Sequence, residues 1–126
     1  MYKRQNEDGS IEKRDKNSDK GGTMRLGAQK AKLKKNSLAN KLYKKTNIFE
    51  RHRHRYEVNP EYVSELEKKG LLISARSEIH NLVEIIGIKD HPWYLGCQFH
   101  PEFTSKPKTG HPLFNDFIKT AVKLKR

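Results

Sequence analysis

The sequence has little of what several common classes of protein require. Its 126 residues include one cysteine, Cys97, which excludes an internal disulfide framework and favours a reducing compartment. No apolar run approaches the roughly 18 residues that a membrane-spanning helix needs. The first 20 residues are charged throughout and lack the apolar centre of a secretory signal. We therefore expect a cytoplasmic protein, or a part of one, with no membrane partner.

Apolar residues are also scarce. Hydrophobic residues make up 33% of the chain and charged residues another 33%, which is a low apolar share for a self-sufficient globular domain. The length allows one domain and is too short for two. Such a chain either carries disordered segments or lacks apolar elements that would complete its core.

Positive charge is in excess, with a formal net charge of +12. Residues 1–45 hold 14 Lys or Arg against 5 Asp or Glu, whereas residues 46–126 hold 13 against 10. A small basic nucleic-acid-binding protein is therefore the alternative interpretation. We disfavour it because most of the excess lies outside the part that looks folded, and a lysine-rich run is usually a solvated face.

The spacing of apolar residues predicts strands and helices in alternation, and so an α/β or α+β fold. Ser37 and Asn59 are expected to cap helices, and a third helix is expected over 112–123. A short edge strand is expected around Ile11. Further strands are expected over 23–33, 48–58, 71–75, 82–88 and 93–99. Four aromatic residues are expected to anchor the core: Trp93, Phe99, Phe114 and Phe117.

The run Gln98-Phe99-His100-Pro101-Glu102-Phe103 carries the clearest chemical signal. On an extended segment His100 and Glu102 would share a face, with Pro101 pointing away. The carboxylate would then fix the imidazole tautomer and leave the other ring nitrogen as a base. The pair lacks a nucleophile, and the plainer interpretation is a strand end with both residues in solvent. Cys97 would lie on the opposite face, about 10 Å away, as a small buried apolar residue.

A second run, Glu50 to Glu57, reads ERHRHRYE. On a strand its two histidines would share one face, and Arg51, Arg53 and Arg55 the other. Three guanidiniums beside the histidines would repel a metal ion, and no Cys or Asp cluster completes a site. The arginine face suits a carboxylate or a phosphate, which a guanidinium binds with two hydrogen bonds. A charged edge strand is the alternative.

Taken together, several runs closely resemble the CTP synthase family. They occur in that family's order and comprise GGTMRLGAQ (21–29), ERHRHRYEVN (50–59), LVEII (82–86), HPW (91–93) and QFHPEFTS (98–105). The resemblance extends from about Asp8 to the end of the chain. It implies a non-family tail over 1–7, for which an assembly artefact is one explanation. Residues 8–126 then correspond to the C-terminal portion of a class I glutamine amidotransferase domain.

The resemblance implies an α/β fold with a mixed sheet flanked by helices, here incomplete. The family makes CTP from UTP with ATP and Mg²⁺, takes ammonia from glutamine through a Cys–His–Glu triad, is activated by GTP and forms homotetramers. His100 and Glu102 match the second and third members of that triad, and Arg55 matches a position that holds glutamine. The family's nucleophile elbow and synthetase domain have no counterpart in these residues. The resemblance therefore predicts a fragment that is inactive alone, with ATP and Mg²⁺ bound outside it.

Overall fold

The computed structural model describes residues 2–5, 11–14 and 24–125 of the chain. A hairpin pairs β1 (Tyr2–Gln5) with β2 (Ile11–Arg14). The predicted strand at Ile11 is thus confirmed.

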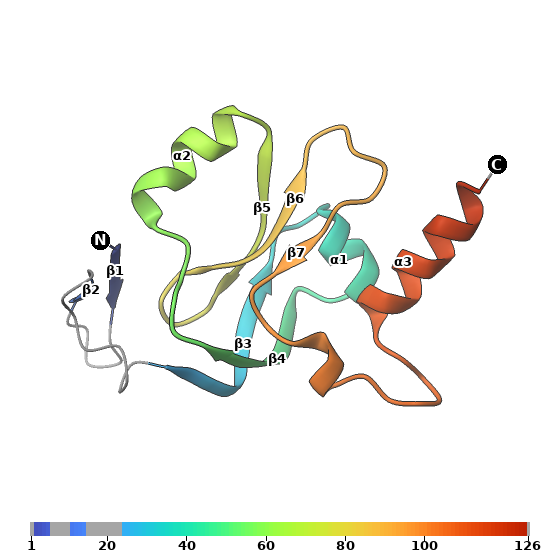
Figure 1. The fold of residues 1–126 in the computed structure, drawn as a ribbon, viewed down its shortest axis with the longest axis horizontal. Helices are drawn as coiled ribbons and strands as arrows, with labels where there is room; N and C mark the ends of the chain where they lie inside the picture. Colours follow the sequence, from blue (N-terminus) through green and yellow to red (C-terminus); the bar gives the residue numbers. More distant parts are fainter. Residues whose placement is uncertain (1, 6–10, 15–23, 126) are drawn as a thin grey trace.

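A five-stranded sheet in the order β4-β3-β5-β6-β7 forms the centre of the molecule (Figure 1). Each of its pairings is antiparallel. The strands are β3 (Arg25–Leu33), β4 (Asn47–His54), β5 (Leu71–Ser77), β6 (Val83–Ile88) and β7 (Gly96–Cys97).

The helices begin where the sequence predicts, because each start has a capping residue. The Ser37 hydroxyl accepts from the Asn40 amide at 3.1 Å and opens α1 (Leu38–Tyr43). The Asn59 side chain accepts from the Glu61 amide at 3.0 Å and opens α2 (Pro60–Lys68). α3 (Pro112–Lys123) also begins as predicted, and a short 3₁₀ turn, η2 (Pro101–Phe103), precedes it.

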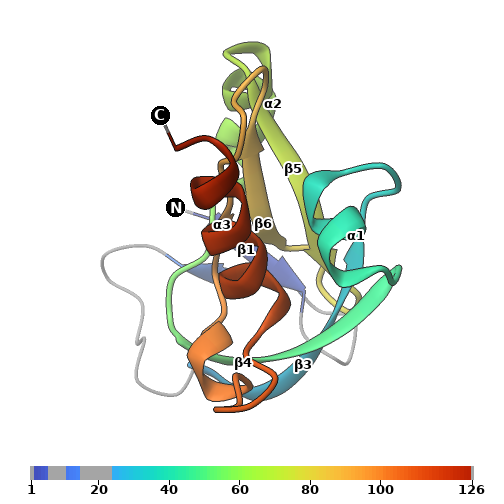
Figure 2. The same ribbon diagram turned by 90° about the vertical axis from the view of Figure 1, so that its right-hand side faces the viewer.

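Two apolar clusters lie on opposite faces of the sheet. One packs beneath α1 and α3, which contact each other on the same side (Figure 2). The other packs beneath α2. Register shifts in the β5–β6 pairing let Ile73 enter the α2 cluster while Ala75 enters the α1–α3 cluster. Such bulges re-aim side chains, so a short strand serves both faces.

The strand expected before α3 is much shorter than predicted. The strand expected over 93–99 is only two residues long, because the Trp93 amide donates to His91 Nδ1 at 3.0 Å rather than to a neighbouring strand. The indole N–H of Trp93 donates to Asp116 at 2.8 Å, which directs the Trp93 ring toward α3.

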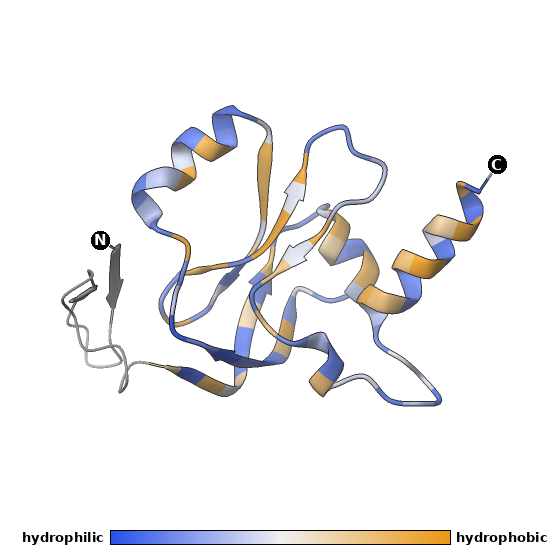
Figure 3. Ribbon diagram, in the orientation of Figure 1, coloured by the Kyte–Doolittle hydropathy of each residue, from blue (hydrophilic) through white to orange (hydrophobic). Residues whose placement is uncertain are grey.

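Of the four expected core aromatics, Phe99 is buried and Trp93 is half-buried. Phe114 and Phe117 are 43% and 51% exposed, so they are wrong as core predictions. They belong to apolar bands that alternate with polar ones along α3 (Figure 3). No helix in the described part of the chain is both long and apolar enough to cross a membrane.

Candidate active site

His100 and Glu102 are in contact, with 2.7 Å between imidazole Nδ1 and carboxylate Oε1. Their side chains are 37% and 54% exposed. The predicted contact is therefore present, and the segment that makes it is not an extended one. Extended geometry ends at His100, the chain turns into η2 at the buried Pro101, and Glu102 reaches back from the first turn of that 3₁₀ helix.

The contact determines which nitrogen of His100 carries its proton. A carboxylate only accepts hydrogen bonds, so Nδ1 is the protonated nitrogen and Nε2 keeps its lone pair. The hydrogen bond from His100 holds the pKa of Glu102 below its usual range. The Phe103 ring stacks on the imidazole, with 4.9 Å between ring centroids and 21° between planes. His100 is thus oriented from one edge and one face.

The β4 strand and the residues after it hold this turn in place. The His100 amide donates to the Arg51 carbonyl at 2.9 Å. Two residues earlier, the Gln98 side-chain amide donates to the Tyr56 carbonyl at 2.7 Å. These bonds join residues 98–100 to residues 51–56 and so bring together the two runs that the sequence singled out.

Arg55 is exposed and lies just beyond the end of β4. It therefore does not share a strand face with Arg51 and Arg53, which corrects the expectation of three arginines on one strand. The Gln98–Tyr56 hydrogen bond nevertheless fixes the segment of Arg55 beside that of His100.

Cys97 is half-buried on β7 and packs against the α1–α3 cluster, in accord with its expected apolar role. Its S–H points to the Phe99 carbonyl at 3.5 Å. Burial, reinforced by the charges of Glu50, Glu102 and Glu84, raises the pKa of this thiol to about 11. Because the thiolate is the nucleophilic form, Cys97 is poorly suited to attack a substrate.

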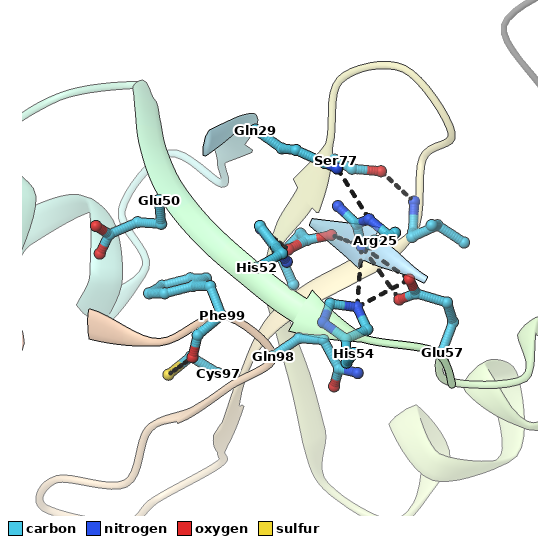
Figure 4. Close-up of polar contacts among 12 residues, drawn as sticks. Arg25, Gln29, Glu50, His52, His54, Glu57, Ser77, Cys97, Gln98 and Phe99 are labelled. Atoms are coloured by element: carbon cyan, nitrogen blue, oxygen red, sulfur yellow. Dashed lines mark hydrogen bonds and ion pairs between the residues drawn. The ribbon is translucent and has the colours of Figure 1, made fainter. Parts of the chain in front are cut away.

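The inward face of β4 carries a buried charge cluster centred on Arg25 (Figure 4). Arg25 donates to Glu84 at 2.7 Å and to Glu57 at 3.0 Å. The two histidines predicted to share a face do so and meet these acids: His52 lies 3.2 Å from Glu84, and His54 lies 2.9 Å from Glu57.

Burial and neighbouring charges shift the pKa values of the side chains in this cluster in different directions. Burial, helped by the Arg25 charge, lowers the pKa of His52 to about 3. Burial raises the pKa of Glu84 to about 7, against the opposing pull of Arg25. Burial would also raise the pKa of Glu57, but its bonds from His54 and Arg25 outweigh that effect and lower it. Among the described residues no group of three or more His, Cys, Asp or Glu is arranged to hold a metal ion.

A separate buried polar cluster surrounds Glu50, which accepts three hydrogen bonds. Thr104 donates to its Oε1 at 2.7 Å and Tyr43 to its Oε2 at 2.8 Å, while His111 Nε2 also donates to Oε2. Burial would raise the pKa of Glu50, but these donors outweigh it and lower the pKa. Sequence reasoning missed this cluster because Thr104 and His111 lie 54 and 61 residues from Glu50, and no local pattern marks the contacts.

An open hollow of about 560 Å³ adjoins the turn. Its lining includes Phe103, which stacks on His100, and the outward side of β4 at Arg51 and Arg53. A hollow of about 620 Å³ at the far end of β3 has a lysine-rich rim and a single acid, Glu78, with neither histidine nor cysteine among its lining residues. Neither His100 nor Glu102 is among the residues that line these two hollows, and the first hollow is the one that adjoins their turn.

Comparison with known proteins identifies relatives of this arrangement. The family model for glutamine amidotransferase class-I matches residues 6–120. A CTP synthase of Buchnera aphidicola subsp. Schizaphis graminum is 62% identical over 114 residues, which are 90% of this chain and 21% of the relative. The solved glutaminase domain of Trypanosoma brucei CTPS with bound acivicin matches at a TM-score of 0.75 and 38% identity, over 82% of this chain and 41% of that one. The chain thus spans about a fifth of the length of the curated relative.

Proposed function

Because the chain belongs to the class I glutamine amidotransferases and is a homologue of CTP synthase, we propose that it supplies the base, the orienting carboxylate and a substrate contact of a glutaminase. The observation that carries this proposal is the 2.7 Å contact between His100 and Glu102. It leaves the lone pair of His100 Nε2 available to move a proton. A base oriented by a carboxylate is what a catalytic triad retains when its nucleophile is removed.

The proposed reaction is hydrolysis of the glutamine side-chain amide. A cysteine outside the described residues gives its proton to His100 Nε2, and its sulfur bonds to the amide carbon. His100 passes that proton to the leaving nitrogen, the carbon–nitrogen bond breaks, and ammonia departs. Water then attacks the thioester carbon while His100 removes a proton from it. The carbon–sulfur bond breaks, glutamate is released, and His100 returns the proton to the sulfur. Glu102 orients the ring throughout by accepting from Nδ1–H.

Arg55 is proposed to hold the glutamine substrate through its α-carboxylate. A guanidinium offers two parallel N–H donors that match a carboxylate. The exposure of Arg55 and its placement beside the His100 segment support this assignment.

The remaining assignments concern a whole CTP synthase. We propose that the ammonia serves CTP formation from UTP in a synthetase domain, where ATP and Mg²⁺ bind outside this chain. GTP activation, a homotetramer and a cytoplasmic location belong to the same proposal. No step in the chemistry of His100 or Glu102 passes through the metal.

Glutamine hydrolysis tests the proposal in two forms of the protein. The chain alone is expected to release no ammonia, because its base has no thiolate to serve. A chimera in which the chain replaces the matching segment of the Buchnera relative is expected to hydrolyse glutamine. In that chimera Cys97→Ser should act as the unchanged control. Ammonia release by the chain alone that Cys97→Ala abolishes would contradict the proposal and make Cys97 the nucleophile.

A further inference from the structure

Both ends of the turn that carries His100 and Glu102 are attached to consecutive residues of β4. At its start, the His100 amide donates to the Arg51 carbonyl at 2.9 Å. At its end, the Thr104 hydroxyl donates to Glu50 Oε1 at 2.7 Å. The same hydroxyl lies 3.3 Å from the Pro101 carbonyl, and the Thr104 amide donates to that carbonyl at 3.1 Å. Thr104 therefore both closes the turn and ties it to β4.

The carboxylate that receives Thr104 is itself firmly held. Glu50 is 3% exposed, and its second oxygen accepts from Tyr43 of α1 and from His111. His111 has only one way to make that bond: its Nδ1 accepts from the Leu113 amide at 3.1 Å, so its proton must be on Nε2. Glu50 thus joins β4 to α1, to the turn and to the start of α3.

The exposed pair needs such an anchor. Glu102 is open to solvent, and an exposed ion pair by itself has little power to hold two side chains in one geometry. The buried end of the connection is different, because three donors surround one carboxylate out of water and charge-assisted hydrogen bonds are strong there. The surface pair is therefore connected, through Thr104 and the Arg51 carbonyl, to a buried and firmly held part of the structure.

We propose that Glu50 is a positioning residue whose buried carboxylate, acting through Thr104, holds His100 and Glu102 in their working geometry. Its importance for catalysis rests on the function proposed above. The positioning itself can be measured without any reaction.

The test uses the intact 126-residue chain and a matched pair of substitutions at Thr104. Thr104→Val keeps the shape and removes the hydroxyl, whereas Thr104→Ser keeps the hydroxyl. We expect the Nδ1–H tautomer of His100, read from imidazole ¹⁵N shifts, to give way in Thr104→Val to the mixture of an unconstrained ring. The pKa of Glu102, read from carboxyl ¹³C shifts, should rise toward its ordinary value. Thr104→Ser should match the wild type in both.

A purely structural role predicts a different result. If Thr104→Val lowers the free energy of unfolding but leaves the His100 tautomer and the Glu102 titration unchanged, the proposal is overturned. Glu50→Gln is a second test, because an amide cannot accept from all three donors. It should change the His100 tautomer and the Glu102 titration as Thr104→Val does. In the chimera, Thr104→Val should lower kcat for glutamine hydrolysis about tenfold with little change in KM. A loosened pair with unchanged kcat would contradict the proposed function and leave the positioning intact.

Discussion

Two histidines eleven residues apart show how neighbours decide the role of an imidazole. His111 is 3% exposed and uses both nitrogens, one as the cap of α3 and one on Glu50. His100 donates from Nδ1 to Glu102, its side chain is 37% exposed, and Nε2 keeps its lone pair. The two rings therefore hold opposite tautomers. Only the ring with an uncommitted nitrogen is suited to proton transfer.

The contact of His100 with Glu102 could be predicted from sequence, because the two residues are close in the chain. The extended backbone on which that contact was first considered is absent, since Pro101 begins a 3₁₀ turn here and the chain does not continue as a strand. The roles of Glu50, Thr104 and His111 could not be predicted, because Thr104 and His111 are far from Glu50 in the chain and meet it only in the folded structure.

A substitution at Arg55 tests its proposed role as the substrate contact. In the chimera, Arg55→Ala should raise KM for glutamine at least tenfold and change kcat much less, because a ground-state carboxylate contact is lost. Steady-state kinetics of ammonia release would measure both constants. Arg53→Ala, an exposed arginine of the same run, is the matched control and should leave KM near the wild-type value. Equal effects of both substitutions would argue for general positive charge rather than a specific contact.

At the scale of elements, the two faces of β4 differ: one is buried and the other is exposed. Its inward side chains, Glu50 and His52, belong to the two buried polar clusters, while Arg51 and Arg53 point outward. The sequence predicted this alternation but extended the strand to residue 58. The strand ends at His54 because Glu57 turns inward to meet His54 and Arg25. That contact depends on β3, and therefore could not be read from the run itself.

The two acids beside Arg25, Glu84 and Glu57, should respond differently to replacement by glutamine. At pH 6 Glu84, with its pKa of about 7, is largely protonated, and its Oε1 accepts from Arg25 without the full charge of a carboxylate. Glu84→Gln keeps an oxygen that accepts from Arg25 and should change the free energy of unfolding by less than about 1 kcal/mol. Glu57→Gln removes the charge that balances buried Arg25 and should cost about 3 kcal/mol.

Urea denaturation of both variants at pH 6 would measure these changes. A large loss for Glu84→Gln, or a small one for Glu57→Gln, would contradict this division of charge. The direction of the Glu84 pKa shift also determines how the stability of the folded chain depends on pH. Its raised pKa favours the folded chain most below pH 4.5, and that contribution is lost as pH rises through about 7.

At the scale of the whole molecule, the order of strands and helices could be predicted because each element carries its own spacing and caps. Which faces are covered could not be predicted. The apolar stripe of α3 indicated a core helix, yet Phe117 and Ile118 are 51% and 59% exposed in the described structure. Helical periodicity reports that a face is apolar, and the packing of other segments determines whether it is buried.

The most direct test of the central claim compares two nitrogen sources for CTP formation by the chimera. With His100→Ala, the base that releases ammonia from glutamine is gone, and a lost general base costs about 10²–10⁴-fold in rate. We predict that CTP formation from glutamine falls by at least that lower factor, while CTP formation from added ammonia stays at the level of the unsubstituted chimera. If both activities fall together, or if neither falls, His100 is not the base of a glutaminase.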